Sequence, residues 1–214
     1  MGHRPGRVLD ALAARIAALP RPALVGIDGV DGVGKTTMAD ALAAVLRAAG
    51  TTVVRVTMDG FHNPRAVRYR RGRTSPLGYF HDSFDLEAFR TVVLEPARAG
   101  GTIRTAVYDH VSDAPVAGEL VPVAGAVVLV DGVFLQRDEL EDAWDLAVFL
   151  RAPFTATYSR MARRDGSHPD PNHPANRRYL EGQELYLRSC RPETRADVVL
   201  DVTDVTAPVV VSGL

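Results

Sequence analysis

One octapeptide, Gly29-Val30-Asp31-Gly32-Val33-Gly34-Lys35-Thr36, constrains this chain more than any other feature of its sequence. It fits G-x-x-x-x-G-K-[ST] at every fixed position, which is the pattern of the phosphate-binding P-loop. The glycines let backbone N–H groups converge on phosphate oxygens, and the next helix adds the positive end of its dipole. An apolar strand over residues 23–28 precedes the loop, and Thr37 opens an amphipathic helix over residues 37–49. We therefore predict a nucleoside-triphosphate site over residues 29–37.

Lys35 is the only lysine among the 25 lysine and arginine residues of the chain, so the other 24 are arginine. A compact ammonium fits inside a phosphate-binding loop, whereas a planar guanidinium is bulkier and less adaptable. The chain has lysine at the position where arginine would fit badly. We expect Lys35 to contact the phosphates and to take part in catalysis.

The bulk properties predict a cytoplasmic protein with one domain over residues 1–214. The formal net charge of −1 provides no overall field that would attract nucleic acid or an anionic membrane. A single cysteine, Cys190, excludes an internal disulfide and fits a reducing compartment. The apolar runs are too short to span a bilayer. We expect small-molecule partners, no nucleic-acid or membrane partner, and we leave a homo-oligomer open.

Five apolar segments alternate with amphipathic ones. The predicted strands cover residues 23–28, 52–57, 126–131, 146–150 and 198–201, and the predicted helices cover residues 8–19, 37–49 and 85–99. Such alternation indicates an α/β fold with a parallel sheet of about five strands and helices on both faces. Short strand-like segments at 103–108 and 119–123 predict a small β-hairpin lobe. Ligands gather at the carboxyl ends of strands in this architecture.

Two of the predicted strands end in an aspartate followed by glycine, at Asp59 and Asp131. Phosphoryl transfer needs an oxygen ligand for Mg²⁺ and a group that orients or deprotonates the attacking hydroxyl. Asp131 follows five apolar residues, as a Walker-B acid does, so we expect it to bind Mg²⁺ together with Thr36. Asp59 is then the candidate base. A role limited to starting a turn is the alternative for each aspartate.

Two segments, about 60–82 and 103–123, are predicted to form a substrate flap. Asp82 has no evident structural role and could accept hydrogen bonds from sugar hydroxyls. Tyr108 offers an aromatic face for a base, with the polar side chains of His110 and Asp113 beside it; an ordinary hairpin end is the alternative. The basic loop from Arg65 to Arg73 fits a substrate flap better than a nucleic-acid surface, because no periodic aromatics accompany it.

A lid is predicted over about residues 160–178. Arg160, Arg163 and Arg164 follow a helix start at Pro153, and a stretch rich in glycine, proline and histidine comes next. Such a segment could close over the triphosphate, exclude water and stabilise the transferring charge, with Arg164 closest to the chemistry. A solvated basic helix face is the alternative.

These motifs, in this order, resemble the uridine kinase branch of the phosphoribulokinase-like P-loop kinases over residues 24–201. The resemblance rests on the P-loop, Asp59, Asp82 with the Phe84-Asp85 that follows it, the segment from Tyr108 to Ser112, Asp131, and Arg164-Asp165. It implies an ATP- and Mg²⁺-dependent transfer to the 5′-hydroxyl of a ribonucleoside, first uridine or cytidine. By this resemblance Asp59 is the acid-base group, Asp82 and Tyr108 contact the nucleoside, and the lid arginines contact phosphates.

The chain departs from that family at several substrate positions. His62, His110 and Asp113 stand where eukaryotic-type uridine kinases have Tyr, Phe and His, and Asp131 stands where Glu is usual. Residues 58–61 also resemble the matching segment of bacterial pantothenate kinases, and the P-loop resembles that of thymidylate kinases, whose Asp-Arg-Tyr motif is missing. Kinases for pantothenate, nicotinamide riboside or a sugar, and a non-catalytic ATP-binding regulator, therefore stay open.

Overall fold

The computed structural model describes residues 5–214, so the first four residues of the predicted domain lie outside it. Its centre is a six-stranded sheet in the order β10-β9-β8-β1-β7-β2. The strands are β1 (Ala23–Gly29), β2 (Val53–Thr57), β7 (Val127–Gly132), β8 (Leu146–Arg151), β9 (Val198–Asp201) and β10 (Val209–Ser212). The first five are parallel, as predicted, whereas β10 runs antiparallel to β9 and was not predicted.

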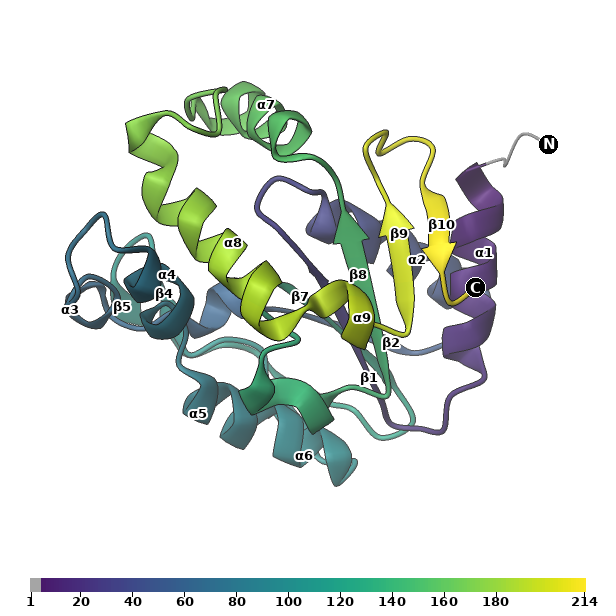
Figure 1. Cartoon of the computed structure of the whole chain (residues 1–214). Coiled ribbons are helices and arrows are strands. Elements are labelled where there is room, and N and C mark those ends of the chain that lie inside the picture. Colours follow the sequence, from purple (N-terminus) through teal and green to yellow (C-terminus); the bar gives the residue numbers. More distant parts are fainter. Residues whose placement is uncertain (1–4) are drawn as a thin grey trace.

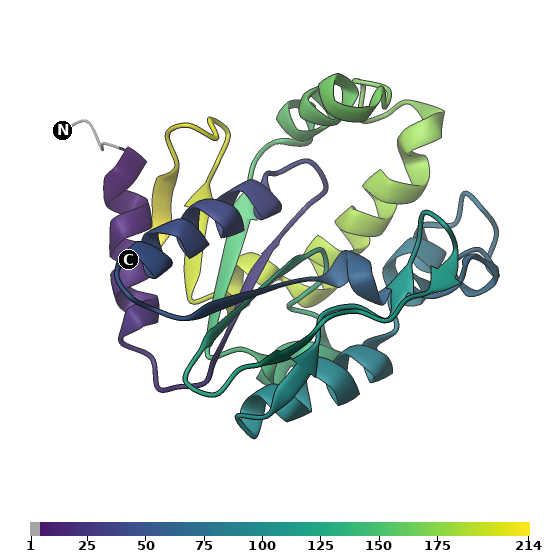
Figure 2. The ribbon, with the colours of Figure 1, turned by 180° about the vertical axis from the view of Figure 1, so that it is seen from behind.

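Helices cover both faces of the sheet (Figure 1). On one face, α1 (Pro5–Ala17) and α2 (Lys35–Ala48) pack against Val25 and Ile27 of β1. On the other, Leu24 of β1 lies in a second apolar layer with Tyr186 of α8 (Arg177–Cys190). Figure 2, from behind, shows α2 in front of the strands that α8 covers in Figure 1. Neighbouring residues of a strand point to opposite faces, so the alternating apolar residues of β1 supply both layers.

The helix predicted over residues 85–99 is present but irregular. It consists of α5 (Leu86–Phe89), a π-helical turn (Arg90–Leu94) and α6 (Glu95–Arg98). The Asp85 carboxylate caps its start by accepting a hydrogen bond of 2.9 Å from the backbone N–H of Ala88. Pro96, just after the π turn, has no N–H to offer a carbonyl four residues earlier, which favours a change in the hydrogen-bond pattern there.

The predicted substrate flap has more helix than its composition suggested. After a 3₁₀ turn (Met58–Phe61) come α3 (Arg65–Arg68) and α4 (Pro76–Asp82), where a loop was expected. The Ser75 hydroxyl accepts a 3.1 Å hydrogen bond from the N–H of Gly78, and Pro76 occupies the first turn of α4, a favourable start for a helix. The predicted hairpin lobe comprises two short antiparallel pairs, β3 (Thr102–Arg104) with β6 (Leu120–Pro122) and β4 (Tyr108–Asp109) with β5 (Ala114–Pro115).

The predicted lid spans the end of one helix and the start of another. α7 (Phe154–Asp165) follows Pro153 as expected, and the loop after it runs through a 3₁₀ turn (Pro174–Asn176) into α8. In Figure 1, α7 lies beyond the carboxyl end of β8. Another 3₁₀ segment (Asp138–Ala143) precedes β8, and α9 (Pro192–Arg195) precedes β9. The lid therefore overhangs the sheet edge at which the strands end.

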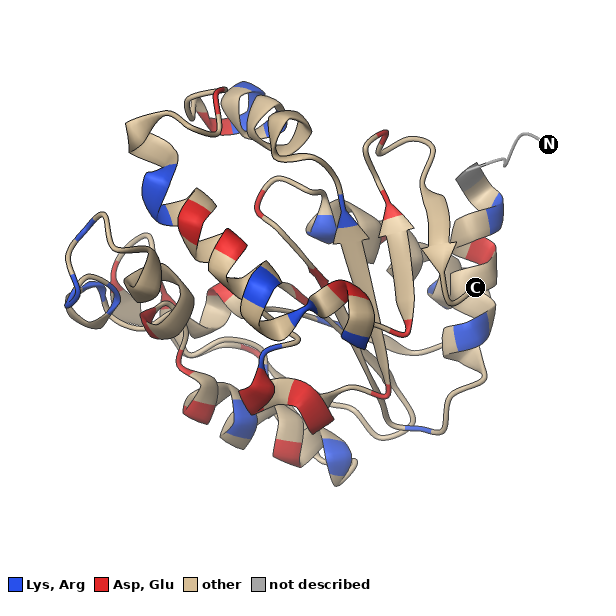
Figure 3. Cartoon of the chain, in the orientation of Figure 1, with Lys and Arg blue, Asp and Glu red and all other residues tan. Residues whose placement is uncertain are grey.

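Basic and acidic residues are interspersed along α8 and along the α5–α6 helix, so neither presents a continuous basic stripe (Figure 3). Within residues 5–214, no helix has both the length and the apolar character needed to cross a membrane.

Candidate active site

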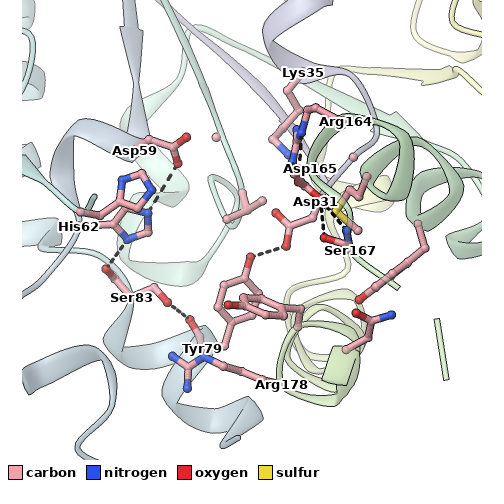
Figure 4. Close-up of a pocket in the computed structure, with 18 of the residues that line it drawn as sticks. Asp31, Lys35, Asp59, His62, Tyr79, Ser83, Arg164, Asp165, Ser167 and Arg178 are labelled. Atoms are coloured by element: carbon pink, nitrogen blue, oxygen red, sulfur yellow. Dashed lines mark hydrogen bonds and ion pairs between the residues drawn. The ribbon is translucent and has the colours of Figure 1, made fainter. Parts of the chain in front are cut away.

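A cleft of about 830 Å³ opens at the carboxyl ends of the parallel strands, beneath the lid. Residues from the P-loop, the strand ends, the flap and the lid line it together. Of the side chains predicted for the site, it is lined by Asp31, Lys35, Thr36, Asp59, His62, His110, Asp131 and Arg164. Figure 4 shows Asp59 and His62 on one side of this cleft and Lys35, Asp31 and Arg164 on the other.

The P-loop has the backbone that its glycines predict. Gly32 and Gly34 have φ angles of 70° and 105°, a region that side-chain-bearing residues rarely adopt. A Cβ added at Gly32 would lie 2.6 Å from the carbonyl oxygen of Thr157 in α7, so the loop packs directly against the lid helix. The ammonium of Lys35 donates a 2.9 Å hydrogen bond to the carbonyl of Val30, across the loop.

A buried carboxylate supports this loop from below. Asp28, the sixth residue of β1, accepts hydrogen bonds from the N–H of Gly29 at 2.7 Å, from the Gln136 amide at 3.3 Å and from the Tyr186 hydroxyl. Burial raises the pKa of Asp28 above its ordinary value, although all three donors act to lower it. Sequence analysis placed Asp28 in a strand and gave it no role; here it ties β1 to α8 under the phosphate-binding turn.

Thr36 and Asp131, the two residues predicted to bind Mg²⁺, lie against each other in the cleft wall. The Thr36 hydroxyl donates a 2.7 Å hydrogen bond to Oδ2 of Asp131, and the guanidinium of Arg55 donates to Oδ1 at 2.6 Å. A hydroxyl and a carboxylate are oxygen donors of the kind that Mg²⁺ prefers. Among residues 5–214, no three His, Cys, Asp or Glu side chains cluster so that they could hold a metal by themselves. These two donors fit a Mg²⁺ that would take its other ligands from phosphate and water.

The acceptor side of the cleft carries a carboxylate beside two imidazoles. The Asp59 side chain is 67% exposed, and its Oδ1 lies 3.7 Å from Nε2 of His62. Interaction with His62 lowers the pKa of Asp59, so this group is a carboxylate at neutral pH. The rings of His62 and His110 have centroids 4.6 Å apart. Burial lowers the pKa of His110, and the neighbouring His62 acts in the same direction.

Three predicted substrate residues are not in the cleft wall. Asp82 is buried and accepts hydrogen bonds from Arg70 at 2.5 Å and Arg71 at 2.8 Å, so its carboxylate binds the flap rather than a sugar. Asp113 accepts a 2.8 Å hydrogen bond from the N–H of Arg65, and Tyr108 is buried in the hairpin lobe. The local reason is the unpredicted pair of helices α3 and α4, which turns these carboxylates toward flap arginines.

Asp113 still affects the cleft indirectly, by holding a side chain that lines it. It accepts a 3.2 Å hydrogen bond from Arg68, whose side chain lines the cleft beside Tyr69. The carboxylate therefore fixes a cleft residue that sequence analysis did not single out for this site.

Of the three lid arginines, only Arg164 lines the cleft, where it pairs with Asp165 at 2.8 Å. The guanidinium of Arg160 donates to the carbonyl oxygens of Val33, Val202 and Thr203 at 2.7 to 3.2 Å. Arg163 donates to the Ser159 hydroxyl at 2.9 Å. The phosphate contacts predicted for Arg160 and Arg163 are thus not supported in this arrangement, because Arg160 braces the P-loop from outside the cleft and Arg163 stays on the surface of α7.

Several aromatic and polar residues of the cleft were not singled out in the sequence. The Tyr79 hydroxyl donates a 2.6 Å hydrogen bond to Asp31, and the N–H of Asp31 donates to the Gln183 amide oxygen at 2.5 Å. Tyr179 and Arg178 also line the wall, and the Tyr158 hydroxyl is buried there without a hydrogen-bond partner in the described structure. The sequence offered a partial signal, because Tyr179, Gln183 and Tyr186 recur at the i, i+4, i+7 spacing of one helix face. Of these three, Tyr179 lines the cleft, whereas Gln183 and Tyr186 bind Asp31 and Asp28 beside it.

The chain is similar in sequence and in fold to known kinases. A uridine kinase of Leuconostoc citreum is 28% identical over 148 residues, which cover 68% of this chain and 69% of that protein. A pantothenate kinase of Shewanella loihica is 28% identical over 186 residues, covering 78% of this chain and 58% of that protein. A solved structure from Bacillus stearothermophilus, described as that of a possible uridine kinase, superposes with a TM-score of 0.72 at 28% identity. The superposition covers 91% of this chain and 97% of the Bacillus stearothermophilus chain.

The profile of one kinase family matches residues 24–168, more than half of the chain, and this stretch includes the P-loop, the flap and the first part of the lid. Such kinases transfer a phosphoryl group to an alcohol, which agrees with a P-loop and a strand-end carboxylate that open onto one cleft. The chain belongs to the phosphoribulokinase/uridine kinase family.

Proposed function

We propose that this kinase uses MgATP to phosphorylate the 5′-hydroxyl of a ribonucleoside, with uridine or cytidine as the first acceptors. One observation supports it most directly: the exposed carboxylate Asp59 opens onto the same cleft as the P-loop lysine Lys35. A phosphoryl donor held at the loop and a hydroxyl held at Asp59 would then lie within one enclosed space. Positioning of this kind supplies much of the catalysis in phosphoryl transfer.

In this proposal each part of the cleft has a defined task. The N–H groups of residues 29–37 and the ammonium of Lys35 bind the β- and γ-phosphates. Thr36 and Asp131 would hold Mg²⁺, which neutralises developing phosphate charge. Asp59 accepts the proton of the attacking hydroxyl, and Arg164 stabilises the transferring group from the lid.

A second, smaller pocket offers a place for the base of ATP. It has a volume of about 100 Å³ and adjoins the P-loop at Gly34 and Thr37. Most of its remaining lining is apolar and comes from α1, α2 and the β9–β10 loop: Leu9, Met38, Ala41, Val202, Val205 and Pro208. A flat heterocycle suits an apolar slot that opens beside a phosphate site.

The uridine kinase relatives support a nucleoside acceptor, and the acceptor end of the cleft has suitable groups. His62 and His110 provide ring nitrogens for polar contacts with a base or a ribose. Tyr79 and Tyr179, whose ring centroids are 4.9 Å apart, add aromatic surface. Since Asp82 is engaged by arginines, the recognition of ribose in this proposal falls to the histidines and to Asp59.

A carboxylate-bearing alcohol such as pantothenate is the second candidate, and one observation favours it. Arg178 is only 6% exposed and lines the cleft, and its guanidinium donates to the carbonyls of Arg68 and Ser75 at 2.9 and 3.0 Å. Within residues 5–214 it has no carboxylate partner. A buried cation without a counter-ion favours an anionic group nearby.

One screen separates these candidates. ADP release is followed with MgATP and, in turn, uridine, cytidine, adenosine, nicotinamide riboside, pantothenate and fructose, with a no-acceptor blank and Lys35→Ala as the control. We expect uridine or cytidine to be phosphorylated and Lys35→Ala to lose the signal. Turnover of pantothenate or fructose with every nucleoside inert would reject the nucleoside proposal and keep the kinase. MgATP binding with no turnover of any acceptor would favour the regulatory alternative.

A further inference from the structure

The His62 imidazole is held in one tautomer. Its Nδ1 lies 3.0 Å from the carbonyl oxygen of Ser83, and a carbonyl can only accept, so Nδ1 must carry a hydrogen. The side chain is 13% exposed and stacks on Phe84 with ring centroids 4.5 Å apart. A β-bridge between His62 and Phe84 and a 2.9 Å hydrogen bond from the N–H of Asn63 to the same Ser83 carbonyl fix the backbone. Neither the ring nor its tautomer is free to change.

A neutral ring fixed in this way presents a lone pair at Nε2, the atom that faces Asp59. Its distance of 3.7 Å from Oδ1 of Asp59 exceeds the range of a hydrogen bond. Both atoms are hydrogen-bond acceptors, so they repel each other as they stand. A proton placed between them would allow a hydrogen bond to form. Figure 4 shows this pair on one side of the cleft, with Asp59 above the His62 imidazole and Ser83 below it.

We propose that His62 is the final acceptor of the proton lost by the attacking hydroxyl, and that Asp59 passes this proton on. The inference rests on the proposed kinase function. As the acceptor oxygen bonds to the γ-phosphorus, the bond from that phosphorus to the oxygen of the departing ADP breaks. The hydroxyl proton moves to a carboxylate oxygen of Asp59 and from there to Nε2 of His62. Asp59 ends as a carboxylate and His62 as an imidazolium, whose Nδ1–H stays on Ser83.

The order of transfer follows from the basicity of the two groups. A free carboxyl group titrates near pH 4 and a free imidazole about two to three units higher, so the imidazole is the better resting place for the proton.

The surrounding charges allow the imidazolium to form. His110 packs against His62, and its lowered pKa keeps it neutral near pH 7, so it adds no opposing charge. Arg68 and Asp109 lie beside His110 and are of opposite sign. Lys35 acts on Asp59 from the P-loop, and the Asp59 carboxylate is the negative group nearest to His62.

The test is the pH dependence of kcat/KM for whichever acceptor the screen identifies. We expect the wild-type rate to rise with pH through a single deprotonation step that depends on His62. His62→Gln cannot change its charge, so this rise should disappear and the rate above it should fall about 10- to 100-fold. His110→Gln should keep the rise, whatever its effect on the rate. His81→Gln, on the exposed side of α4, should leave both rate and profile unchanged.

A rise that persists in His62→Gln, or one that disappears in His110→Gln instead, would overturn the proposal. If His62→Gln fails to fold, ¹⁵N NMR of the wild-type protein still decides, because the neutral His62 ring must be protonated at Nδ1. Protonation of the neutral ring at Nε2 contradicts the relay. This spectrum needs no turnover, so failure of the kinase function in the screen and failure of the relay are seen separately.

Discussion

The Asp82 carboxylate is fully buried between two arginines that are themselves 47% and 60% exposed. Burial alone would raise the pKa of Asp82, but the hydrogen bonds from Arg70 and Arg71 hold it below 3.8. A carboxyl group with a depressed folded-state pKa contributes stability above its unfolded value and loses it as the pH falls through the folded value. Asp82→Asn should therefore destabilise the protein at pH 7, by about 1 to 2 kcal/mol given the exposed partners.

Urea unfolding of wild type and Asp82→Asn from pH 7 downward checks this expectation. The difference in unfolding free energy should shrink as the pH falls below 3.8, and the preference for ribose over deoxyribose should change little. A variant of wild-type stability that no longer distinguishes the two sugars would restore the sugar-binding role first predicted for Asp82.

At the residue scale, sequence analysis located the cleft groups that belong to short local motifs. Lys35 and Thr36 are fixed by the P-loop pattern, and Asp59 and Asp131 follow apolar strands, so their positions depend on few other residues. Tyr108 and Asp113 were expected in the same cleft but lie behind its wall. The direction of their side chains depends on how α3 packs on the hairpin lobe, and no local pattern encodes that contact. Their predicted neighbour His110 does reach the cleft.

At the element scale, the close packing of the P-loop against α7 can be tested by substituting one glycine, Gly32. Gly32→Ala combines an unfavourable φ of 70° with a Cβ 2.6 Å from the Thr157 carbonyl. Gly50→Ala is the matched control, because Gly50 has a φ of 82° and no atom within 4 Å of the added Cβ. Both should lose stability, by about 1 kcal/mol for the backbone conformation alone. Gly32→Ala should in addition weaken MgATP binding at least tenfold by calorimetry. Equal ATP affinity in the two variants would contradict the close packing.

Elements were predictable where their apolar pattern was continuous. The five parallel strands were found because apolar residues predominate in each, and three of them, β1, β7 and β8, are buried along almost their whole length. β10 was missed since Val209 is 55% exposed and Val211 is 43% exposed, and an exposed edge strand has no burial pattern to reveal it. α4 was missed because arginines, glycines and prolines interrupt the sequence around it, although Ser75-Pro76 is a recognisable helix start.

At the scale of the whole molecule, a ligand that binds only the folded chain should raise its melting temperature. At an MgATP concentration one hundred times the dissociation constant, the stabilisation is about 2.7 kcal/mol, or roughly 5 to 10 °C for a chain of this size. Lys35→Ala should have the melting temperature of the wild type when no nucleotide is present, because the Lys35 ammonium lines the cleft and donates its hydrogen bond to the loop carbonyl of Val30 rather than to the core. It should lose most of the MgATP shift and about 10³-fold in turnover. If Lys35→Ala showed the full MgATP-induced rise in melting temperature and normal turnover, Lys35 would not be a phosphate-binding residue.

Several whole-molecule properties stay predictions. They are the single domain over residues 1–214, the cytoplasmic location, the lack of nucleic-acid and membrane partners, and the open question of a homo-oligomer. Composition and net charge motivate them, and the arrangement of strands and cleft is compatible with more than one answer. The identity of the acceptor substrate also stays a prediction, because it depends on a few cleft contacts rather than on the fold.

The lone ε-amine of Lys35 lies in the wall of the cleft rather than on the outer surface. Acetylation, ubiquitin attachment and amine-directed reagents all act on such amines, and in this sequence Lys35 is the only one that they could modify. Any acylation of a lysine would thus remove the charge that we propose to bind the phosphates. For this protein, lysine modification and loss of phosphoryl transfer would be a single event.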